Sequence, residues 1–326
     1  MRYRRFAKIT IYSELKEVEE VYAFDVDTEK LKKSEEYDLI VCDSMEELLA
    51  RVDAVSICVP TKYHFEVAKR AIENGVHCLI EKPITLTVDE AEELVNLLDN
   101  SGLIAGVGHI ERFNPIVGEI KRIIKNPLYV EIMRHNPAST RITDSSIVED
   151  LMIHDIDIVF NVLYKPLQGL LVSPSWACGG TGGGARDGAA EPHSGEYELY
   201  SAGNNDLCTA VIKFNSSIVS LSASRKASKK IRSVYVEEEE FTIEGDFMNQ
   251  EIYVYRKPGK YGIENEQYTQ ENIIEKVLVN KVEPLKEELK AFIKCVKKCE
   301  EFTITPLQAL NNLRICEAIR KSNGIL

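Results

Sequence analysis

Three ionisable side chains stand where their types and spacing could support proton transfer. Asp150 and His154 are four residues apart in the helical-looking run EDLMIHDIDIV, so both lie on one face of a helix. Lys82 follows the strand-like run VHCLI within the tripeptide Glu81-Lys82-Pro83. A side chain that titrates near neutral pH is suited to acid–base work, which points to His154, and a lysine ammonium stabilises negative charge developing on oxygen. A solvated polar stripe extended by Asp157, and an exposed lysine before a proline turn, are the alternatives.

A further carboxylate, Asp25, ends the β-branched and aromatic run VYAFDV. A dinucleotide fold places an acidic residue there to accept hydrogen bonds from the adenosine ribose, which favours NAD over NADP. DVDT is also a good turn sequence, so the two interpretations are evenly balanced.

The elements around these residues alternate between strand and helix. Capping-box spacings at Ser44/Glu47 and Thr87/Glu90 open two helices, and a third, from His64 to Asn74, stops at Gly75. The strand-like runs between them are residues 21–26, 38–42, 54–60, 76–80 and 103–108. This rhythm predicts a parallel, doubly wound α/β sheet that binds its ligand at the carboxyl ends of the strands.

One part of such a fold has no counterpart in the sequence. A dinucleotide fold begins with a strand and a Gly-x-Gly-x-x-Gly turn, and nothing like them precedes the helical run RRFAKITIYSEL. Either the start codon is placed too late or the chain is clipped. We expect the loss of this central strand to expose edges on its two neighbours.

The rest of the chain has a different pattern. From Tyr129 to Lys257 alternating strand-like runs joined by short polar turns predict a large open antiparallel sheet, with the helix from Asp150 on one face. Two C-terminal helices are expected, one from about Ile274 to Cys299 and one opened by Thr305. Residues 173–195 lack periodicity and are interpreted as a loop, either an insertion or a reading-frame error. We therefore predict two domains, residues 1–108 and 109–326.

Composition limits the functional classes. A formal net charge of −12 over 326 residues argues against a nucleic-acid or anionic-membrane partner. No apolar run has the length of a membrane span, and the eight cysteines lack zinc-like spacing, so we expect a cytoplasmic protein with reduced thiols and no metal.

Taken together, the segments resemble one family of dehydrogenases. The order VPTKYHFEVAKRAIENGVHCLIEKPIT, then GHIERFNP, then Asp150-Leu-x-x-His154 is similar to that of the glucose–fructose oxidoreductase, inositol dehydrogenase and MocA family of NAD(P)-dependent enzymes. The resemblance covers nearly the whole chain after about residue 6. It implies a Rossmann-type domain lacking its first strand and a C-terminal α/β domain for substrate binding and oligomerisation.

The resemblance also implies roles for individual residues. Lys82 matches the lysine that hydrogen-bonds the reacting hydroxyl, His154 the general acid/base, and Asp150 the carboxylate beside it. The peptide between Lys82 and Pro83 is often cis in such proteins. The residues implied for the cofactor are Asp25, Pro60, Thr61, His64, Glu81 and Arg112, and those for the substrate are Lys82, Asn114, Arg141 and His154.

Within the family, the motifs are most similar to members that oxidise the C3 hydroxyl of UDP-N-acetylglucosamine or its uronic acid with NAD, ahead of 2,3-diamino sugar synthesis. We look to Arg141 for the diphosphate, with Arg134 and the group Arg225, Lys226, Lys229 and Lys230 as further candidates; solvated loop positions are the alternative. A homodimer or homotetramer is expected. An inositol or simple-sugar dehydrogenase stays open, as does a non-catalytic or defective member, since the pyrophosphate-binding turn is absent.

Overall fold

The computed structural model describes residues 2–27, 31, 39–137, 146–164, 197–214, 216–257, 261–264, 267–270 and 273–322. It consists of two compact units, Met1–Phe113 with Val282–Leu313, and Asn114–Lys281 with Arg314–Leu326. The chain thus returns to the first unit after completing most of the second. The domain boundary expected after residue 108 stays a prediction.

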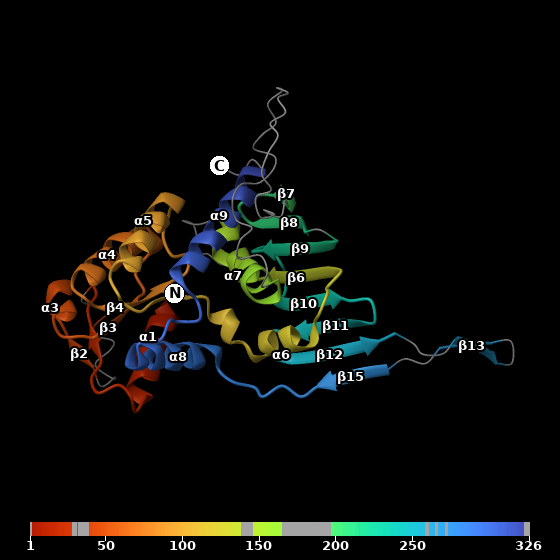
Figure 1. Cartoon of the computed structure of the whole chain (residues 1–326), viewed down its shortest axis with the longest axis horizontal. Helices are drawn as coiled ribbons and strands as arrows, with labels where there is room; N and C mark the ends of the chain where they lie inside the picture. The colour runs from red at the N-terminus through yellow and green to blue at the C-terminus, as the bar shows by residue number, and fades with distance from the viewer. Residues whose placement is uncertain are drawn as a thin grey trace, which may run out of the picture. The chain divides into compact units, whose positions relative to one another are not determined.

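The first unit contains the expected parallel strands in two separate ladders (Figure 1). One joins β1 (Tyr22–Ala23) to β2 (Ile40–Val41), and the other joins β3 (Ala54–Ile57), β4 (His77–Glu81) and β5 (Ala105–Gly108). The division falls between β1–β2 and β3–β5. The helical elements of this unit are α1 (Arg2–Glu14), α3 (Met45–Leu49), η1 (Thr61–Tyr63), α4 (His64–Glu73), α5 (Val88–Asp99), η2 (Ile110–Phe113), α8 (Pro284–Lys298) and the start of α9 (Pro306–Ser322).

Local sequence signals set the ends of these helices as expected. The Ser44 hydroxyl accepts a hydrogen bond from the Glu47 N–H and caps α3. Thr87 and Glu90 form a complete capping box at the start of α5. Gly75 follows α4 with φ of 75°, a left-handed conformation that glycine adopts without steric cost.

The core of the first unit lies around β4 and β5. Leu79 and Ile80 are fully buried, and Phe302 stacks edge-on against Phe292 of α8. At Gly106 an added Cβ would come within 2.2 Å of the Phe302 ring, so only glycine fits this close approach of ring to strand. The C-terminal segment Val282–Leu313 thus packs on β5 and contributes Phe292 and Phe302 to the core of the first unit.

The second unit is built on one eight-stranded sheet, ordered β15-β12-β11-β10-β6-β9-β8-β7 (Figure 1). Its strands are β6 (Tyr129–His135), β7 (Tyr197–Gly203), β8 (Leu207–Phe214), β9 (Ser217–Ser224), β10 (Ile231–Glu237), β11 (Phe241–Asp246), β12 (Glu251–Arg256) and β15 (Ile273–Val277). A small hairpin of β13 (Tyr261–Glu264) and β14 (Gln267–Gln270) forms a separate ladder.

Two expectations for this unit need correction. The sheet is mixed, because β6 pairs with β9 in parallel, whereas a fully antiparallel sheet was predicted. Residues from Ile274 onward were expected to start a helix, but Ile273–Val277 forms edge strand β15 beside β12. Its β-branched residues suit a strand, and pairing with a neighbour decides the conformation of so short a run. The helix, α8, starts at Pro284.

One face of the large sheet is covered by helices. Val130 and Ile132 alternate with outward residues along β6 and share a buried core with Ile116 and Ile120 of α6 (Pro115–Ile123). The same core includes the continuous helical run η3 (Val148–Met152), α7 (Ile153–Ile158) and η4 (Val159–Leu163), of which η3 and η4 are π-helical. The helix from Asp150 therefore packs on the sheet as predicted.

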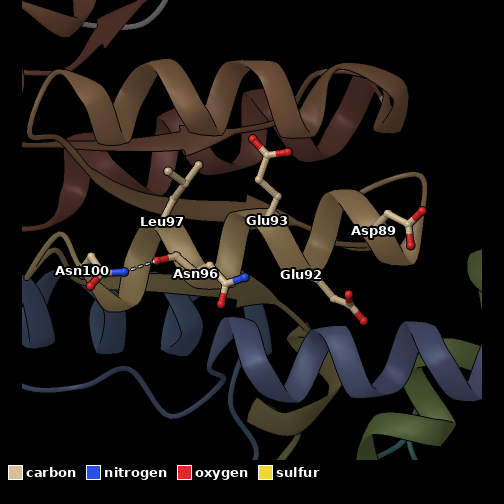
Figure 2. Close-up of a pocket in the computed structure, with 6 residues that line it drawn as sticks. All are labelled: Asp89, Glu92, Glu93, Asn96, Leu97 and Asn100. Atoms are coloured by element: carbon tan, nitrogen blue, oxygen red, sulfur yellow. Dashed lines mark hydrogen bonds between the residues drawn. The ribbon is translucent and has the colours of Figure 1, made fainter.

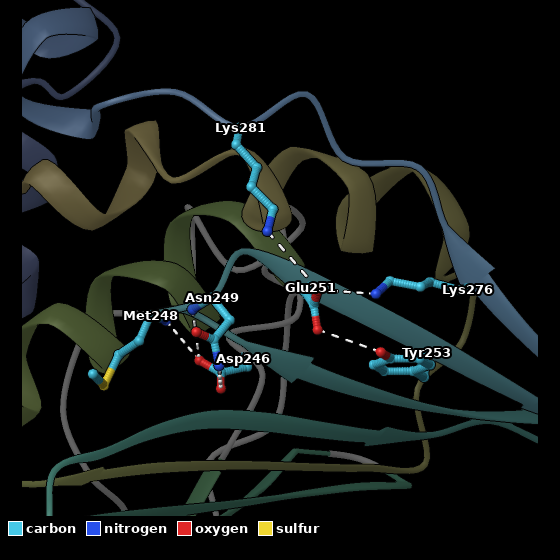
Figure 3. Close-up of polar contacts among 7 residues, drawn as sticks. All are labelled: Asp246, Met248, Asn249, Glu251, Tyr253, Lys276 and Lys281. Carbon is cyan, nitrogen blue, oxygen red and sulfur yellow. Dashed lines mark hydrogen bonds and ion pairs between the residues drawn. The ribbon is translucent and has the colours of Figure 1, made fainter.

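Polar contacts fix the far edge of this sheet (Figure 3). The Asp246 carboxylate accepts hydrogen bonds from the backbone N–H groups of Met248 and Asn249 and shapes the turn between β11 and β12. Glu251 of β12 forms an ion pair of 2.9 Å with Lys276 of β15. The Glu251–Lys276 pair thus joins edge strand β15 to β12.

No helix among the described residues is long and apolar enough to cross a membrane.

Candidate active site

In the first unit the carboxyl ends of three parallel strands meet at one edge. Ile57 pairs with Ile80, and Glu81 pairs with Gly108, so the segments that follow these strands leave the sheet side by side. Pro60 and Thr61 lie in the first of these segments, before α4. Ligands of open α/β sheets bind at this edge.

Lys82 follows β4 at this edge and is buried, with 7% of its surface exposed. The peptide between Lys82 and Pro83 is cis, as the family resemblance implied. Lys82 and its cis peptide therefore lie at the carboxyl end of β4, where the sequence analysis expected them.

His64 connects two of these strand-end segments. Its Nδ1 lies 2.8 Å from the Pro83 carbonyl oxygen and its Nε2 lies 3.0 Å from that of Val59. The side chain is fully buried, and burial lowers its pKa, although both carbonyl hydrogen bonds act in the opposite direction. His64 thus connects the segment after β3 to the Lys82–Pro83 segment. Its expected position near the cofactor stays a prediction.

Glu81 belongs to a buried cluster of charges. The Lys8 ammonium of α1 lies 2.9 Å from the Glu81 carboxylate and 3.9 Å from that of Glu288 of α8. Burial lowers the pKa of Lys8, but the nearby negative charges, Glu81 first, outweigh it and hold that pKa well above its usual value. An added Cβ at Gly108 would lie 3.3 Å from the Glu81 carboxylate, so this glycine leaves room for it. Sequence reasoning missed Lys8, which had no recognisable motif.

Asp25 lies two residues beyond β1 and forms a turn. One of its carboxylate oxygens accepts a hydrogen bond of 3.0 Å from the Asp27 N–H. This bond supports the turn interpretation of DVDT, and the ribose contact expected of Asp25 stays a prediction.

Arg112 and Asn114 make contacts within their own units. Arg112 donates to the Thr303 carbonyl and to the Gln308 side chain, at 3.1 and 2.8 Å. Asn114 caps α6 and donates to the Phe247 carbonyl at 2.9 Å. Both contacts position backbone segments, and the roles expected of these residues toward cofactor and substrate stay predictions.

In the second unit Asp150 and His154 lie on the continuous helical run that packs on the large sheet. His154 is 5% exposed. Asp150 falls in the π-helical turn, where residues four to five apart share a face, so the two side chains remain on one side of the helix. The Arg225 guanidinium lies 3.2 Å from the Asp150 carboxylate.

Arg134 anchors the same helix. It donates to both carboxylate oxygens of Asp155, with the pair 99% buried. In YVEIMRH the residues Val130, Ile132 and Arg134 share one strand face, so alternation could have placed this arginine in the core. Arg134 is thus an anchor of the helix, and its earlier assignment to the diphosphate is not supported by its position.

The remaining candidate residues of the sequence analysis are either outside the described residues or on the surface. Arg141 and residues 173–195 lie outside the described residues. Lys226 is exposed and paired with Asp206. A shallow surface hollow on α5 contains none of the predicted site residues (Figure 2); it is lined by Asp89, Glu92, Glu93, Asn96, Leu97 and Asn100. Among the described residues no group of His, Cys, Asp or Glu could hold a metal ion.

The first unit fits a nicotinamide dinucleotide in part. Asp25 would hold the adenosine ribose, and Pro60, Thr61 and the Lys82–Pro83 segment would flank the rest of the cofactor at the strand ends.

Fold and site together have the arrangement typical of dinucleotide-binding α/β proteins: parallel strands with polar residues at their carboxyl ends, followed by a large sheet domain. Residues 5–109 match the model of the oxidoreductase family with an NAD-binding Rossmann fold. Over these residues the chain is similar to the glucose–fructose oxidoreductase, inositol dehydrogenase and MocA family.

Two known dehydrogenases are similar to parts of this chain. UDP-N-acetylglucosamine 3-dehydrogenase of Acidithiobacillus ferrooxidans is 32% identical over 232 residues, which are 68% of this chain and 66% of the relative. The NAD⁺-dependent scyllo-inositol 2-dehydrogenase of Bacillus subtilis is 33% identical over 116 residues, 33% of this chain and 34% of the relative. The chain thus matches just under two thirds of the first of these proteins and about a third of the second.

Solved structures share the fold across both units. The structure of the same Acidithiobacillus ferrooxidans enzyme superposes with a TM-score of 0.79 at 24% identity, covering 97% of this chain and 93% of that one. A 3-ketoreductase from Actinomadura kijaniata, solved with TDP-benzene and NADP, gives 0.74 at 14% identity, covering 97% and 93%. The Rossmann-type fold followed by a large sheet is confirmed.

Proposed function

We propose that this chain is an NAD-dependent dehydrogenase that oxidises the C3 hydroxyl of a UDP-N-acetylamino sugar, UDP-N-acetylglucosamine or its uronic acid. The observation that carries the proposal is the 32% identity to UDP-N-acetylglucosamine 3-dehydrogenase, which extends over 232 residues and so well beyond residues 5–109. The ketone would then be available for transamination to a 2,3-diamino sugar.

The side chains have the chemistry that this reaction needs. His154 takes the proton of the C3 hydroxyl, since an imidazole titrates near neutral pH. Lys82, from its match to the lysine of the Glu81-Lys82-Pro83 motif, would donate a hydrogen bond to the reacting oxygen and stabilise developing negative charge. Asp150 lies on the His154 side of the helix and favours the protonated imidazole. NAD, when bound, accepts the hydride from C3.

The test is to identify the product. The protein is incubated with NAD and UDP-N-acetylglucosamine, or with its uronic acid, and the sugar is examined by ¹³C NMR for a ketone at C3. Scyllo-inositol serves as the competing substrate, because a relative of 33% identity over 116 residues acts on it. A ketone formed from the inositol alone would assign the chain to the second substrate class.

We also propose that the chain forms a homodimer or homotetramer through the large sheet. Tyr200, Val211, Ile218 and Ile274 are exposed and point away from the buried sheet face, which leaves apolar side chains in water. Light scattering after size exclusion should give a multiple of the 36.8 kDa chain mass. A monomer at micromolar concentration would contradict this proposal.

A further inference from the structure

Arg225 follows β9 directly and is nearly buried, with a side chain 9% exposed. One guanidinium nitrogen, Nη2, donates to the Asp150 carboxylate and to the Ser146 carbonyl, both at 3.2 Å. The other, Nη1, lies 3.4 Å from the Asn205 carbonyl. The fixed fork of donors thus connects the end of strand β9 to the start of the helix that carries His154.

These contacts fix both the backbone and the carboxylate. The Ser146 carbonyl that Arg225 binds also accepts the Asp150 N–H at 3.0 Å, so the first turn of the helix and the Asp150 side chain have a common partner. Hydrogen bonds between ionised groups are stronger than neutral ones, and little water reaches this pair.

We propose that Arg225 is a positioning residue of the candidate site: it holds the Asp150 carboxylate on the His154 face of the helix and offsets the negative charge that this carboxylate presents to the imidazole. The proposal rests on the proposed function for the role of His154. The Asp150 carboxylate and the Arg225 guanidinium act on His154 with opposite charges, and either charge can be removed by a single substitution.

Other charged groups near the helix also affect the protonation of His154. Two further arginines bind helix carboxylates, since Arg134 pairs with Asp155 and Arg320 pairs with Glu149 at 2.7 Å. Burial raises the pKa of the nearby Cys208 thiol to about 11, so it stays neutral. The charged groups on the helix and those that bind it directly from the described elements include Glu149, Asp150, Asp155, Asp157, Arg134, Arg225, Arg320 and Lys121. Further charges on the packed elements are Glu119, Arg122, Glu131, His135, Arg314, Glu317 and Lys321.

The two halves of the pair should have opposite effects on His154. Without Arg225 the Asp150 charge is no longer offset, so the imidazole holds its proton to higher pH. With Asp150→Asn the guanidinium charge remains, so the imidazole loses its proton at lower pH. Opposite charges near an ionisable group typically shift its titration by about one pH unit.

The experiment is a pH titration of histidine ring signals by NMR in the full-length protein, with the His154 signal assigned by its loss in His154→Gln. We expect the midpoint to rise in Arg225→Ala, fall in Asp150→Asn and return toward the wild-type value in Arg225→Lys. Lys226→Ala, which removes the neighbouring exposed charge, is the matched control and should leave the midpoint unchanged. Shifts of the same sign in Arg225→Ala and Asp150→Asn, no shift in either, or an equal shift in Lys226→Ala would overturn the proposal.

This measurement does not depend on turnover. If the wild type fails to oxidise any UDP-sugar while the opposite shifts are observed, the proposed function fails and the Arg225 pairing stands. If turnover is present, the acidic limb of kcat/KM should follow the NMR midpoints, whereas a purely structural arginine would lower kcat without moving that limb.

Discussion

At the scale of single residues, His154 is the side chain whose chemistry the proposed reaction needs most. It is 5% exposed and lies on a helix that is held by Arg225 after strand β9 and by the buried Arg134 of β6. A general base contributes about 10²- to 10⁴-fold to a rate, so His154→Ala should lower kcat within that range.

Binding of NADH should be nearly unaffected in the same variant, which fluorescence titration measures. His135→Ala is the control, because this histidine of β6 bonds Ser222 from the neighbouring strand β9. Unchanged turnover in His154→Ala would remove the residue from the mechanism.

Asp25 carries the second prediction at this scale. Its carboxylate beyond β1 should disfavour the ribose phosphate of NADP through charge repulsion, so Asp25→Ser should reduce the preference for NAD by about tenfold, or ~1.4 kcal/mol. The ratio of kcat/KM for the two cofactors measures it, with Asp27→Ser as the matched turn variant. A preference that does not change would leave Asp25 as a turn residue alone.

At the scale of elements, the buried ion pairs decide how the segments around the strand ends are held. Lys8 connects α1 to the end of β4 and to α8. Lys8→Met leaves buried carboxylates without their cation and should lower the free energy of unfolding by about 3–5 kcal/mol.

Denaturant unfolding measures this loss. Lys286→Met removes a more exposed lysine that pairs with Glu14 between the same two helices, and should cost less than about 1 kcal/mol. The double variant Lys8→Met with Glu81→Gln should regain part of the stability. Equal losses in the two single lysine variants would contradict a special role for the buried pair.

His64 makes the same edge of the sheet sensitive to pH. Burial lowers its pKa below the ordinary value of 6.5, so the unfolded chain binds the proton more readily than the folded one. Its contribution to stability is therefore complete above pH 6.5 and declines as the pH falls toward the folded pKa.

Unfolding curves of wild type and His64→Gln, measured from neutral to mildly acidic pH, test this sign. The variant should be less stable at neutral pH by about 1–3 kcal/mol, because the Val59 and Pro83 carbonyls lose their shared partner. The difference should shrink in acid. A difference that grows in acid would contradict the assignment.

At the scale of the whole molecule, local signals predicted the elements better than their pairing. The capping residues Ser44 and Thr87 and the C-cap Gly75 act within a few residues, so the sequence alone located those helix ends. The parallel pairing of β6 with β9 joins strands more than eighty residues apart in the chain, and no local pattern encodes such a choice.

The candidate site shows the same division. Lys82, Asp150 and His154 could be selected by motif and spacing, because each belongs to a short recognisable segment. The contacts of Lys8 and Arg225 could not be predicted, since their partners lie 73 and 75 positions away and are brought near only by the fold. Arg225 was predicted either to contact the diphosphate or to be a solvated loop residue, and it is nearly buried against the helix.

The central claim is oxidation of a UDP-amino sugar with NAD, and the most direct measurement is NADH formation, followed by absorbance. UDP-N-acetylglucosamine, its uronic acid and scyllo-inositol are compared at equal concentration, with His154→Ala as the inactive control. We predict NADH formation with at least one UDP-sugar, at a rate well above that with scyllo-inositol, and its loss in the variant. NADH formation with scyllo-inositol alone, or none with any of the three while NAD still binds, would contradict the account.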